Sequence, residues 1–321
     1  MVQQLPNTKP TDAKQETASD PKPTGATLAN TTDSVEDSES NDTEFNDTEF
    51  DDTIDELDIS HLKIEDDKPV DNFQSAQQQR LLVDTLWSND TLPRPFIAEA
   101  NVGLFYQIKG DPVVPDMLLS LGVQKAEDYS EKRNRAYFVW ELGKVPEVCI
   151  EVVSNREGDE VAISAKSKRK GKTSSRKDRY ARIGVPYYVV FDPLQRIQDE
   201  ANMNGALLRV WSLVSGRYVE LTSEVGITAA GQSIQLETVG LGLTVWEGPY
   251  EEQIPQLWLR WCDTQGNLLL TGAEGKAIEK QRADAAQQKA DAAQQKADAE
   301  QQKAERLAEK LRQMGVDPDE I

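Results

Sequence analysis

Histidine is almost absent from this chain of 321 residues, and the single one, His61, lies in an acidic N-terminal segment. A core without histidine cannot use Ser-His-Asp or Cys-His catalysis, and it cannot bind a metal through imidazole. Any catalysis in the core must therefore use carboxylates, lysine or a hard metal ion.

Cysteine and long apolar runs are scarce as well. Cys149 and Cys262 lie far apart in separate apolar runs, so the sequence has no Cys pair or Cys/His cluster for zinc. We expect both to be buried, reduced thiols. The N-terminus, MVQQLPNTKP, lacks the apolar segment of a signal peptide, and no apolar stretch is long enough to span a membrane. We therefore expect a cytoplasmic protein that has no membrane partner.

The formal charge of −20 is concentrated in one part of the chain. Residues 1–75 contain 20 acidic and 5 basic side chains, a net charge of −15, so the remainder carries −20 − (−15) = −5. The acidity therefore does not argue against a nucleic-acid ligand for the rest of the chain.

Residues 1–73 are rich in polar and acidic side chains and contain a tandem repeat, NDTEFNDTEF. Such a segment buries too little apolar surface to offset its ordering entropy, so we expect a disordered acidic tail. A solubilising tail is the simpler interpretation. The alternative is a short recognition motif around Phe45, Phe50, Ile54, Leu57 and Ile59.

Residues 74–272 have the pattern of a folded α/β domain. SAQQQRLLVDTLW predicts a first helix, and the β-rich runs FIAEANVGLFYQI, VVPDMLLSLGV, YFVW and VPEVCIEVVS follow it. The last run is apolar almost throughout, which is typical of a central strand covered on both faces. SSRKDRYARIG predicts a helix ending at Gly184, and VPYYVVFDP predicts another buried strand, in the order of a right-handed crossover. Later runs, including ALLRVWSLV, RYVELT and LGLTVWEG, predict antiparallel additions.

Residues 273–321 repeat with a period of seven, as in ADAAQQK ADAAQQK ADAEQQK AERLAEK. This period predicts a long helix with a narrow alanine seam. Alanine buries little surface, so self-association would depend on Leu307, Leu311 and Met314. A homo-oligomer formed through this helix and an exposed single helix are both open interpretations.

Two carboxylates carry the strongest chemical signal. Asp116 in VVPD and Glu151 in IEVVS each lie at or within an apolar strand, where a charge is costly unless something compensates it. Two such acids on adjacent strands could share one Mg²⁺ or Mn²⁺. A bound ion of this kind activates water for attack on a phosphodiester. Lys177 and Arg176, on the following helix, are the nearest candidates for a catalytic cation.

A basic segment lies between these parts. Residues 166–182 hold nine Lys or Arg and one acid, Asp178. Its first half could bind a phosphate backbone beside the metal, although a solvated loop explains the same charges. The candidate nucleic-acid-binding residues are Lys166, Lys168, Arg169, Lys170 and Lys172.

Asp116 in VVPD, Glu151 in VPEVCIEVVS and the run RKDRYARIGVPYYVVFDP together resemble the Uma-two family of bacterial restriction endonucleases. The resemblance covers roughly residues 75–250, and the C-terminal LRQMGVDPDE is also similar to family members. It implies the PD-(D/E)xK restriction-endonuclease-like fold, a mixed sheet flanked by helices. It further implies a Mg²⁺-dependent phosphodiester hydrolase, with Asp116 and Glu151 as first and second acids.

One position departs from the parent motif. The lysine expected two residues after the second acid is Val153 here. The family resemblance implies that the cation comes instead from the next helix, four residues before Tyr180, where this chain has Arg176 beside Lys177. An arginine cannot act as a neutral base. Either a small shift brings Lys177 into use, or activity is reduced or lost.

Three functions therefore stay open: a Mg²⁺- or Mn²⁺-dependent DNA endonuclease, a nucleic-acid-binding module that does not cut, and a scaffold that associates through its C-terminal helix. Glu99 is either a further ligand or a strand-edge acid, and Asp192 is expected to cap a strand end. The tryptophans expected in the core or at an interface are Trp140, Trp246, Trp258 and Trp261.

Overall fold

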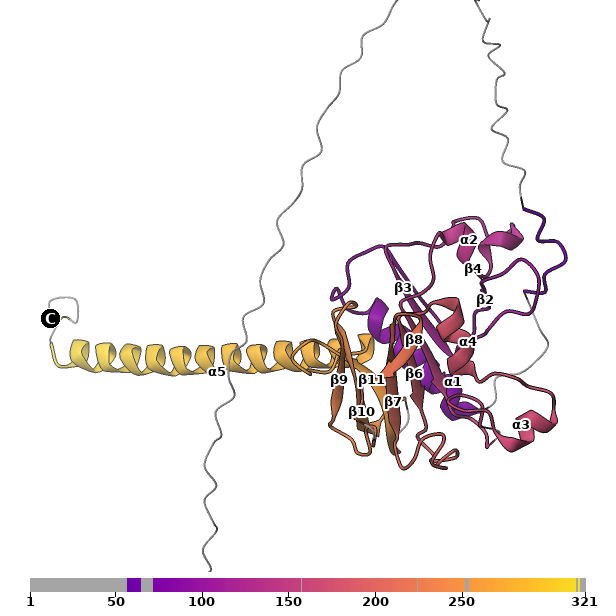
Figure 1. The fold of residues 1–321 in the computed structure, drawn as a ribbon. Helices are drawn as coiled ribbons and strands as arrows, with labels where there is room; N and C mark the ends of the chain where they lie inside the picture. The colour runs from indigo at the N-terminus through magenta and orange to yellow at the C-terminus, as the bar shows by residue number, and fades with distance from the viewer. Residues whose placement is uncertain are drawn as a thin grey trace, which may run out of the picture. The chain divides into compact units, whose positions relative to one another are not determined.

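A six-stranded mixed sheet lies at the centre of the protein, with strand order β1-β3-β5-β6-β7-β8 (Figure 1). The computed structural model describes residues 57–64, 72–156, 158–223, 225–251, 254–315 and 317, without the side chains of residues 165 and 166. The strands of this sheet are β1 (Phe96–Glu99), β3 (Met117–Leu121), β5 (Val148–Val152), β6 (Tyr187–Phe191), β7 (Leu208–Val214) and β8 (Arg217–Glu220).

The other described elements surround this sheet. A second, antiparallel sheet has the order β11-β10-β9, and β2 and β4 form a short parallel pair. These strands are β2 (Leu104–Phe105), β4 (Tyr137–Phe138), β9 (Ser233–Leu236), β10 (Leu241–Pro249) and β11 (Pro255–Cys262). The helices are α1 (Phe73–Trp87), the 3₁₀ turn Lys132–Asn134, α2 (Val139–Leu142), α3 (Ala165–Arg169), α4 (Arg176–Ile183) and α5 (Gly272–Gln313).

The predicted strand–helix–strand block is confirmed. All five residues of β5 and all five of β6 are buried, and the two strands pair in parallel. The connecting helix α4 starts at a capping box formed by Ser175 and Asp178 and ends at Gly184 in the left-handed conformation, with φ 95°. The predicted mixed α/β fold with a long C-terminal helix is therefore correct, although YFVW is a strand only at Tyr137–Phe138 and continues as α2.

The central sheet separates two apolar clusters. Successive side chains of a strand point to opposite faces, so Ile150 and Val152 of β5 join one cluster while Cys149 and Val153 join the other. Glu151 lies between Cys149 and Val153 and therefore faces the second cluster, which also contains Tyr180 of α4. This alternation directs one carboxylate toward α4.

Helix α1 connects the two sheets. Gln78 of α1 lies against β11: its Nε2 donates to the carbonyl of Leu259 at 2.8 Å, and its Oε1 accepts from the Leu259 amide at 2.9 Å. The indole Nε1 of Trp261 donates to the carbonyl of Leu82 at 3.1 Å. The predicted burial of Trp258 and Trp261 is confirmed, since both are fully buried.

Part of the expected acidic tail packs against the domain. Leu62 is only 6 % exposed and contacts Phe105 and Phe138, while His61 Nε2 lies 2.9 Å from the carbonyl oxygen of Ile108. Ile59 also packs in this cluster. The rest of the recognition motif considered for the tail, at Phe45, Phe50 and Ile54, lies outside the described residues.

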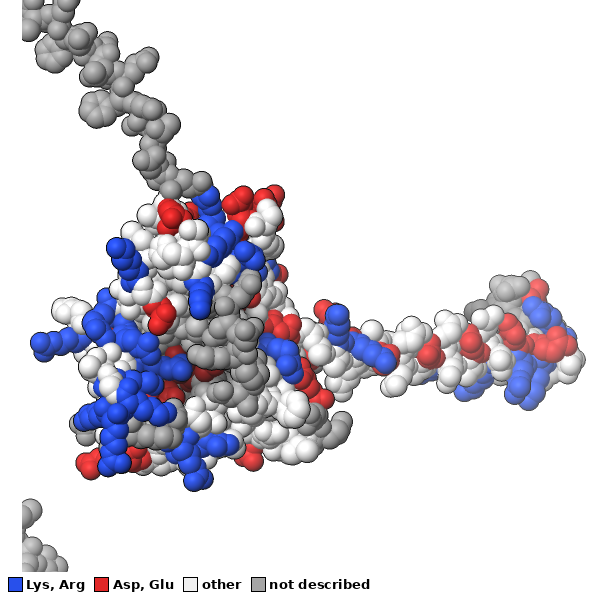
Figure 2. Space-filling model, turned by 90° about the vertical axis from the view of Figure 1, so that its right-hand side faces the viewer, with Lys and Arg blue, Asp and Glu red and all other residues white. Residues whose placement is uncertain are grey.

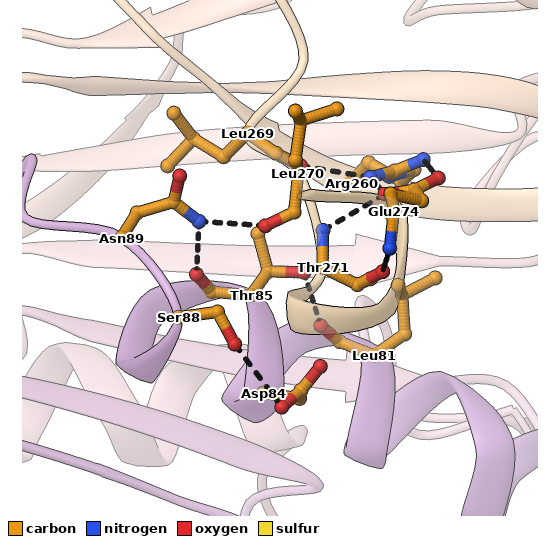
Figure 3. Close-up of polar contacts among 10 residues, drawn as sticks. All are labelled: Leu81, Asp84, Thr85, Ser88, Asn89, Arg260, Leu269, Leu270, Thr271 and Glu274. Carbon is orange, nitrogen blue, oxygen red and sulfur yellow. Dashed lines mark hydrogen bonds and ion pairs between the residues drawn. The ribbon is translucent and has the colours of Figure 1, made fainter. Parts of the chain in front are cut away.

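The start of α5 is fixed by polar contacts with β11 (Figure 3). The buried Arg260 donates to both carboxylate oxygens of Glu274, at 2.8 and 2.7 Å, and to the carbonyl of Leu269 at 2.7 Å. Thr271 and Glu274 form the capping box of the helix. Further along, no described side chain of α5 is buried, and Leu307 is 61 % exposed. Self-association through α5 stays a prediction.

Candidate active site

Asp116 and Glu151 come together because β3 and β5 are adjacent. These strands are antiparallel, and Met117 pairs with Ile150. Continuing this register by one residue brings Asp116, just before β3, beside Glu151 of β5, whose side chain faces α4. The chain thus places its two predicted acids in one place, as expected of ligands for a shared cation.

Glu151 is held by two groups of α4. Its side chain is 1 % exposed; Oε1 accepts a hydrogen bond of 2.8 Å from the Tyr180 hydroxyl, and Oε2 contacts the guanidinium of Arg176. Burial raises the pKa of Glu151 to about 8; Arg176 opposes this rise and Asp116 adds to it.

Two of the groups that hold Asp116 are donors from different parts of the fold. Its Oδ2 accepts from the backbone amide of Val152 at 2.6 Å, and its Oδ1 accepts from Nε2 of Gln79 on α1 at 2.8 Å. Hydrogen bonds to a carboxylate favour its charged form. Asp116 is consequently fixed by hydrogen bonds beside a more deeply buried acid.

Helix α4 presents Arg176 and Tyr180 to the same carboxylate because residues four apart lie on one side of a helix. Its first turn is also tied to the loop after β5: the amides of Arg176 and Lys177 donate to the carbonyls of Asp159 and Glu160, at 2.7 and 3.1 Å. The position of the Arg176 guanidinium beside Glu151 is therefore fixed by backbone hydrogen bonds of α4 as well as by the ion pair.

Lys177 points elsewhere. Its ammonium lies 4.9 Å from the ring centre of Trp211, a cation–π distance, and burial lowers its pKa. Of the two adjacent cations considered from the sequence, the structure brings Arg176 to Glu151 and places Lys177 over β7. A catalytic role for Lys177 would require a movement of α4, and none of its described contacts supports one.

The basic segment before α4 is on the protein surface. Figure 2, which faces the side where α3 and α4 lie, shows Lys and Arg side chains gathered on this part of the molecule. Lys168, Arg169 and Lys170 are exposed, and Lys172 pairs with the buried Asp159. The side chain of Lys166 lies outside the described part. A phosphate backbone can reach the three exposed cations.

The two other acids considered from the sequence have separate partners. Glu99 forms an ion pair with Lys125. Asp192 is fully buried and accepts from the amides of Arg196 and Ile197, at 2.9 and 3.0 Å. The prediction that Asp192 caps a strand end is confirmed.

Sequence reasoning missed the role of two residues. In the sequence, Tyr180 served only to locate Arg176, yet its hydroxyl donates to Glu151. A buried glutamate needs hydrogen-bond donors, and Tyr180 lies four residues after Arg176, on the same side of the helix. This spacing could have identified Tyr180 as a donor. The signal for Gln79 was weaker: it is a polar residue at a position of α1 where the periodicity predicts an apolar, buried one. Its contact with Asp116 joins positions 37 residues apart, and local patterns do not report such contacts.

The donor set fits a hard divalent ion that keeps part of its water shell. Within the described residues, no three His, Cys, Asp or Glu side chains are grouped so that they could hold a metal by themselves. Mg²⁺ is commonly bound by one or two carboxylates, with water and substrate phosphate completing its shell. Asp116 and Glu151 supply such a pair of carboxylates, and each carboxylate oxygen has two lone pairs for donors or a cation.

Comparison with protein families agrees with this geometry. Residues 44–245 match the Uma2 (Uma-two) family, described as "putative restriction endonuclease", and the chain belongs to this family. The family is nuclease-like, and restriction-endonuclease-like families usually use a divalent metal. Searches of curated proteins and of solved structures gave no match. None of the helices in the described part of the chain is both long and apolar enough to cross a membrane.

Proposed function

We propose that this protein is a divalent-metal-dependent endonuclease that hydrolyses phosphodiester bonds in DNA. The observation that carries the proposal is the meeting of Asp116 and Glu151 on adjacent strands, with the Arg176 guanidinium on Glu151. Membership of a restriction-endonuclease family supports DNA as the substrate class. Cys149 and Cys262 are buried free thiols, which is compatible with the reducing cytoplasm as the site of action.

Asp116 and Glu151 would hold Mg²⁺ or Mn²⁺. When bound, such an ion lowers the pKa of a water molecule and stabilises charge on the phosphate under attack. The residues around the acids keep them in place: the Val152 amide holds Asp116, and the Tyr180 hydroxyl holds Glu151. Arg176 adds a fixed positive charge beside the acids, where the developing negative charge of the phosphate would lie.

Metal removal tests this proposal. The purified full-length chain is expected to nick supercoiled plasmid DNA with Mg²⁺ or Mn²⁺ and to lose this activity in EDTA, because two carboxylates alone repel a phosphodiester. Gel electrophoresis of the plasmid measures both results. Cleavage that continues unchanged in EDTA would contradict the proposal.

A non-cutting nucleic-acid module is the second candidate, and Arg176 is the observation that favours it. A guanidinium stays protonated and cannot accept a proton from water. If DNA is retained in Mg²⁺ without any cleavage, this second function replaces the first.

The basic segment makes a separate prediction about binding. Replacing Lys168, Arg169 and Lys170 by glutamine should weaken DNA binding and reduce the slope of log affinity against log salt by up to about 2.7, because each lost phosphate contact contributes about 0.9. Fluorescence anisotropy of a labelled duplex in EDTA measures this slope.

The matched control removes the same charge from α5. Lys289, Lys296 and Lys303 are exposed lysines of the heptad helix, and their replacement by glutamine should leave the slope nearly unchanged. Equal effects of the two triple variants would show that net charge alone governs DNA binding, and would remove the basic segment from the site.

A further inference from the structure

Gln79 is a buried amide that contacts a metal-site acid from a distant element. It belongs to α1, its residue is 5 % exposed, and its Nε2 donates to Asp116 Oδ1 at 2.8 Å. A buried glutamine must satisfy both ends of its amide. The residue that donates to the side-chain oxygen of Gln79 therefore also influences the contact with Asp116.

That partner is Asn101, in the turn after β1. Its Nδ2 donates to Gln79 Oε1 at 2.7 Å. A carboxylate can only accept, so Asp116 requires the NH₂ end of Gln79, which leaves Oε1 for the NH₂ end of Asn101. Asn101 has a positive φ of 54°, a conformation that asparagine tolerates better than most residues. The Gln79 NH₂ group also lies 3.5 Å from Asn101 Oδ1, so the two amides pair side by side while Gln79 donates to Asp116.

The amide chain completes the fixation of Asp116. The Val152 amide holds Oδ2 of this carboxylate at 2.6 Å, and Gln79 holds Oδ1. With both oxygens held by donors, the carboxylate plane cannot rotate freely. The orientation of the carboxylate is therefore fixed relative to Glu151 on the neighbouring strand.

We propose that Gln79 is a positioning residue that orients Asp116 for a divalent cation, and that Asn101 sets the direction of the Gln79 amide. This inference rests on the proposed function, since it concerns the same acids. Groups that orient metal ligands through hydrogen bonds typically change metal affinity by about 10- to 100-fold when they are removed.

The preceding residue, Gln78, provides a matched control. It is also a buried glutamine of α1, 1 % exposed, but its amide bonds only to the backbone of Leu259. Removing the amide of Gln78 should therefore destabilise the packing of α1 without changing the geometry of Asp116.

The test measures Mn²⁺ binding to the full-length chain by isothermal titration calorimetry, with thermal unfolding recorded for each variant. Gln79→Met keeps the side-chain length and removes the donor, and should weaken Mn²⁺ binding about tenfold or more. Gln78→Met should lower the unfolding temperature and leave the Mn²⁺ affinity within about twofold, as expected of a group with no bond to a ligand.

Asn101→Asp is the second variant, at an exposed position that can be changed with little risk to the fold. An aspartate there only accepts, so Gln79 Oε1 loses its donor, and the Gln79 NH₂ group, which lies 3.5 Å from Asn101 Oδ1, is drawn from Asp116 toward a second carboxylate. Added negative charge alone would tighten Mn²⁺ binding, whereas the lost orientation weakens it. We expect weaker binding; unchanged or tighter binding in both Gln79→Met and Asn101→Asp would overturn the inference.

The same titration separates this inference from the proposed function. Asp116→Asn is expected to abolish Mn²⁺ binding at this site. If the unchanged protein binds no Mn²⁺, or if Asp116→Asn binds it equally well, the metal site itself is refuted and the role of Gln79 with it. If Asp116→Asn loses binding and Gln79→Met does not, the role of Gln79 alone is refuted.

Discussion

Replacing Asp116 by asparagine is expected to reduce metal-dependent DNA cleavage by at least about a thousandfold, since the charge stabilisation provided by a bound metal is worth several kcal/mol and each 1.36 kcal/mol is a factor of ten. The change removes one of the two negative charges available to the cation. It also places an NH₂ group against Gln79 Nε2 or the Val152 amide, which are both donors. Initial rates of plasmid nicking in Mn²⁺ measure the loss.

The variant Asp111→Asn is the matched control. Asp111 is an exposed carboxylate in the segment that leads into β3, and it has no role in the proposed site. Its replacement should leave the cleavage rate within about twofold, as for most exposed substitutions. Circular dichroism of both variants checks the fold. Comparable cleavage by Asp116→Asn and the unchanged chain would remove Asp116 from the mechanism.

Replacing Arg176 by methionine is expected to reduce cleavage about a hundredfold, which is the usual cost of losing one preorganised group that stabilises developing charge. Among the described residues, the change leaves the Tyr180 hydroxyl as the donor to the buried Glu151 carboxylate. Arg176→Lys keeps a positive charge at this position and should retain cleavage within about tenfold of the unchanged chain, because the charge is preserved although the planar fork of donors is lost.

The two Arg176 variants also distinguish the two candidate functions. If the unchanged chain binds DNA without cutting it and Arg176→Lys cuts, the arginine is what prevents turnover, and the natural chain is the non-cutting module. If Arg176→Met cuts as fast as the unchanged chain, the guanidinium has no part in catalysis.

The centre of the fold could be predicted from the sequence because its signals are local. The apolar runs that form β5 and β6 and the glycine at position 184 define a strand–helix–strand unit, and the two strands pair in parallel. The meeting of Asp116 and Glu151 could also be predicted, since both acids interrupt apolar strands that are adjacent in such a fold.

The choice between Arg176 and Lys177 was within reach of sequence reasoning. Consecutive residues of a helix point about 100° apart, whereas residues four apart share a side. Because Tyr180 is buried on the face toward Glu151, helical geometry places Arg176, and not Lys177, on that same face.

Other features depend on contacts between segments far apart in sequence. Leu62 packs against Phe105 and Phe138, which lie more than 40 residues later in the chain. The sequence around Leu62 contains no pattern that identifies these partners. The bond between Gln79 and Asp116 likewise depends on how α1 docks, which Gln78 and Trp261 fix through β11. The acidic composition around Leu62 predicted a tail rather than a packed segment. The periodicity of α1 gives no information about the partner of Gln79.

The most direct measurement compares plasmid cleavage by the full-length chain and by Glu151→Gln, purified in parallel, in Mg²⁺, in Mn²⁺ and in EDTA. Glutamine keeps the shape of the side chain in its buried position and removes the negative charge that a divalent ion requires. We predict cleavage only by the unchanged chain and only with metal present. Equal cleavage by both proteins would contradict the assignment of Asp116 and Glu151 as the metal site of a nuclease.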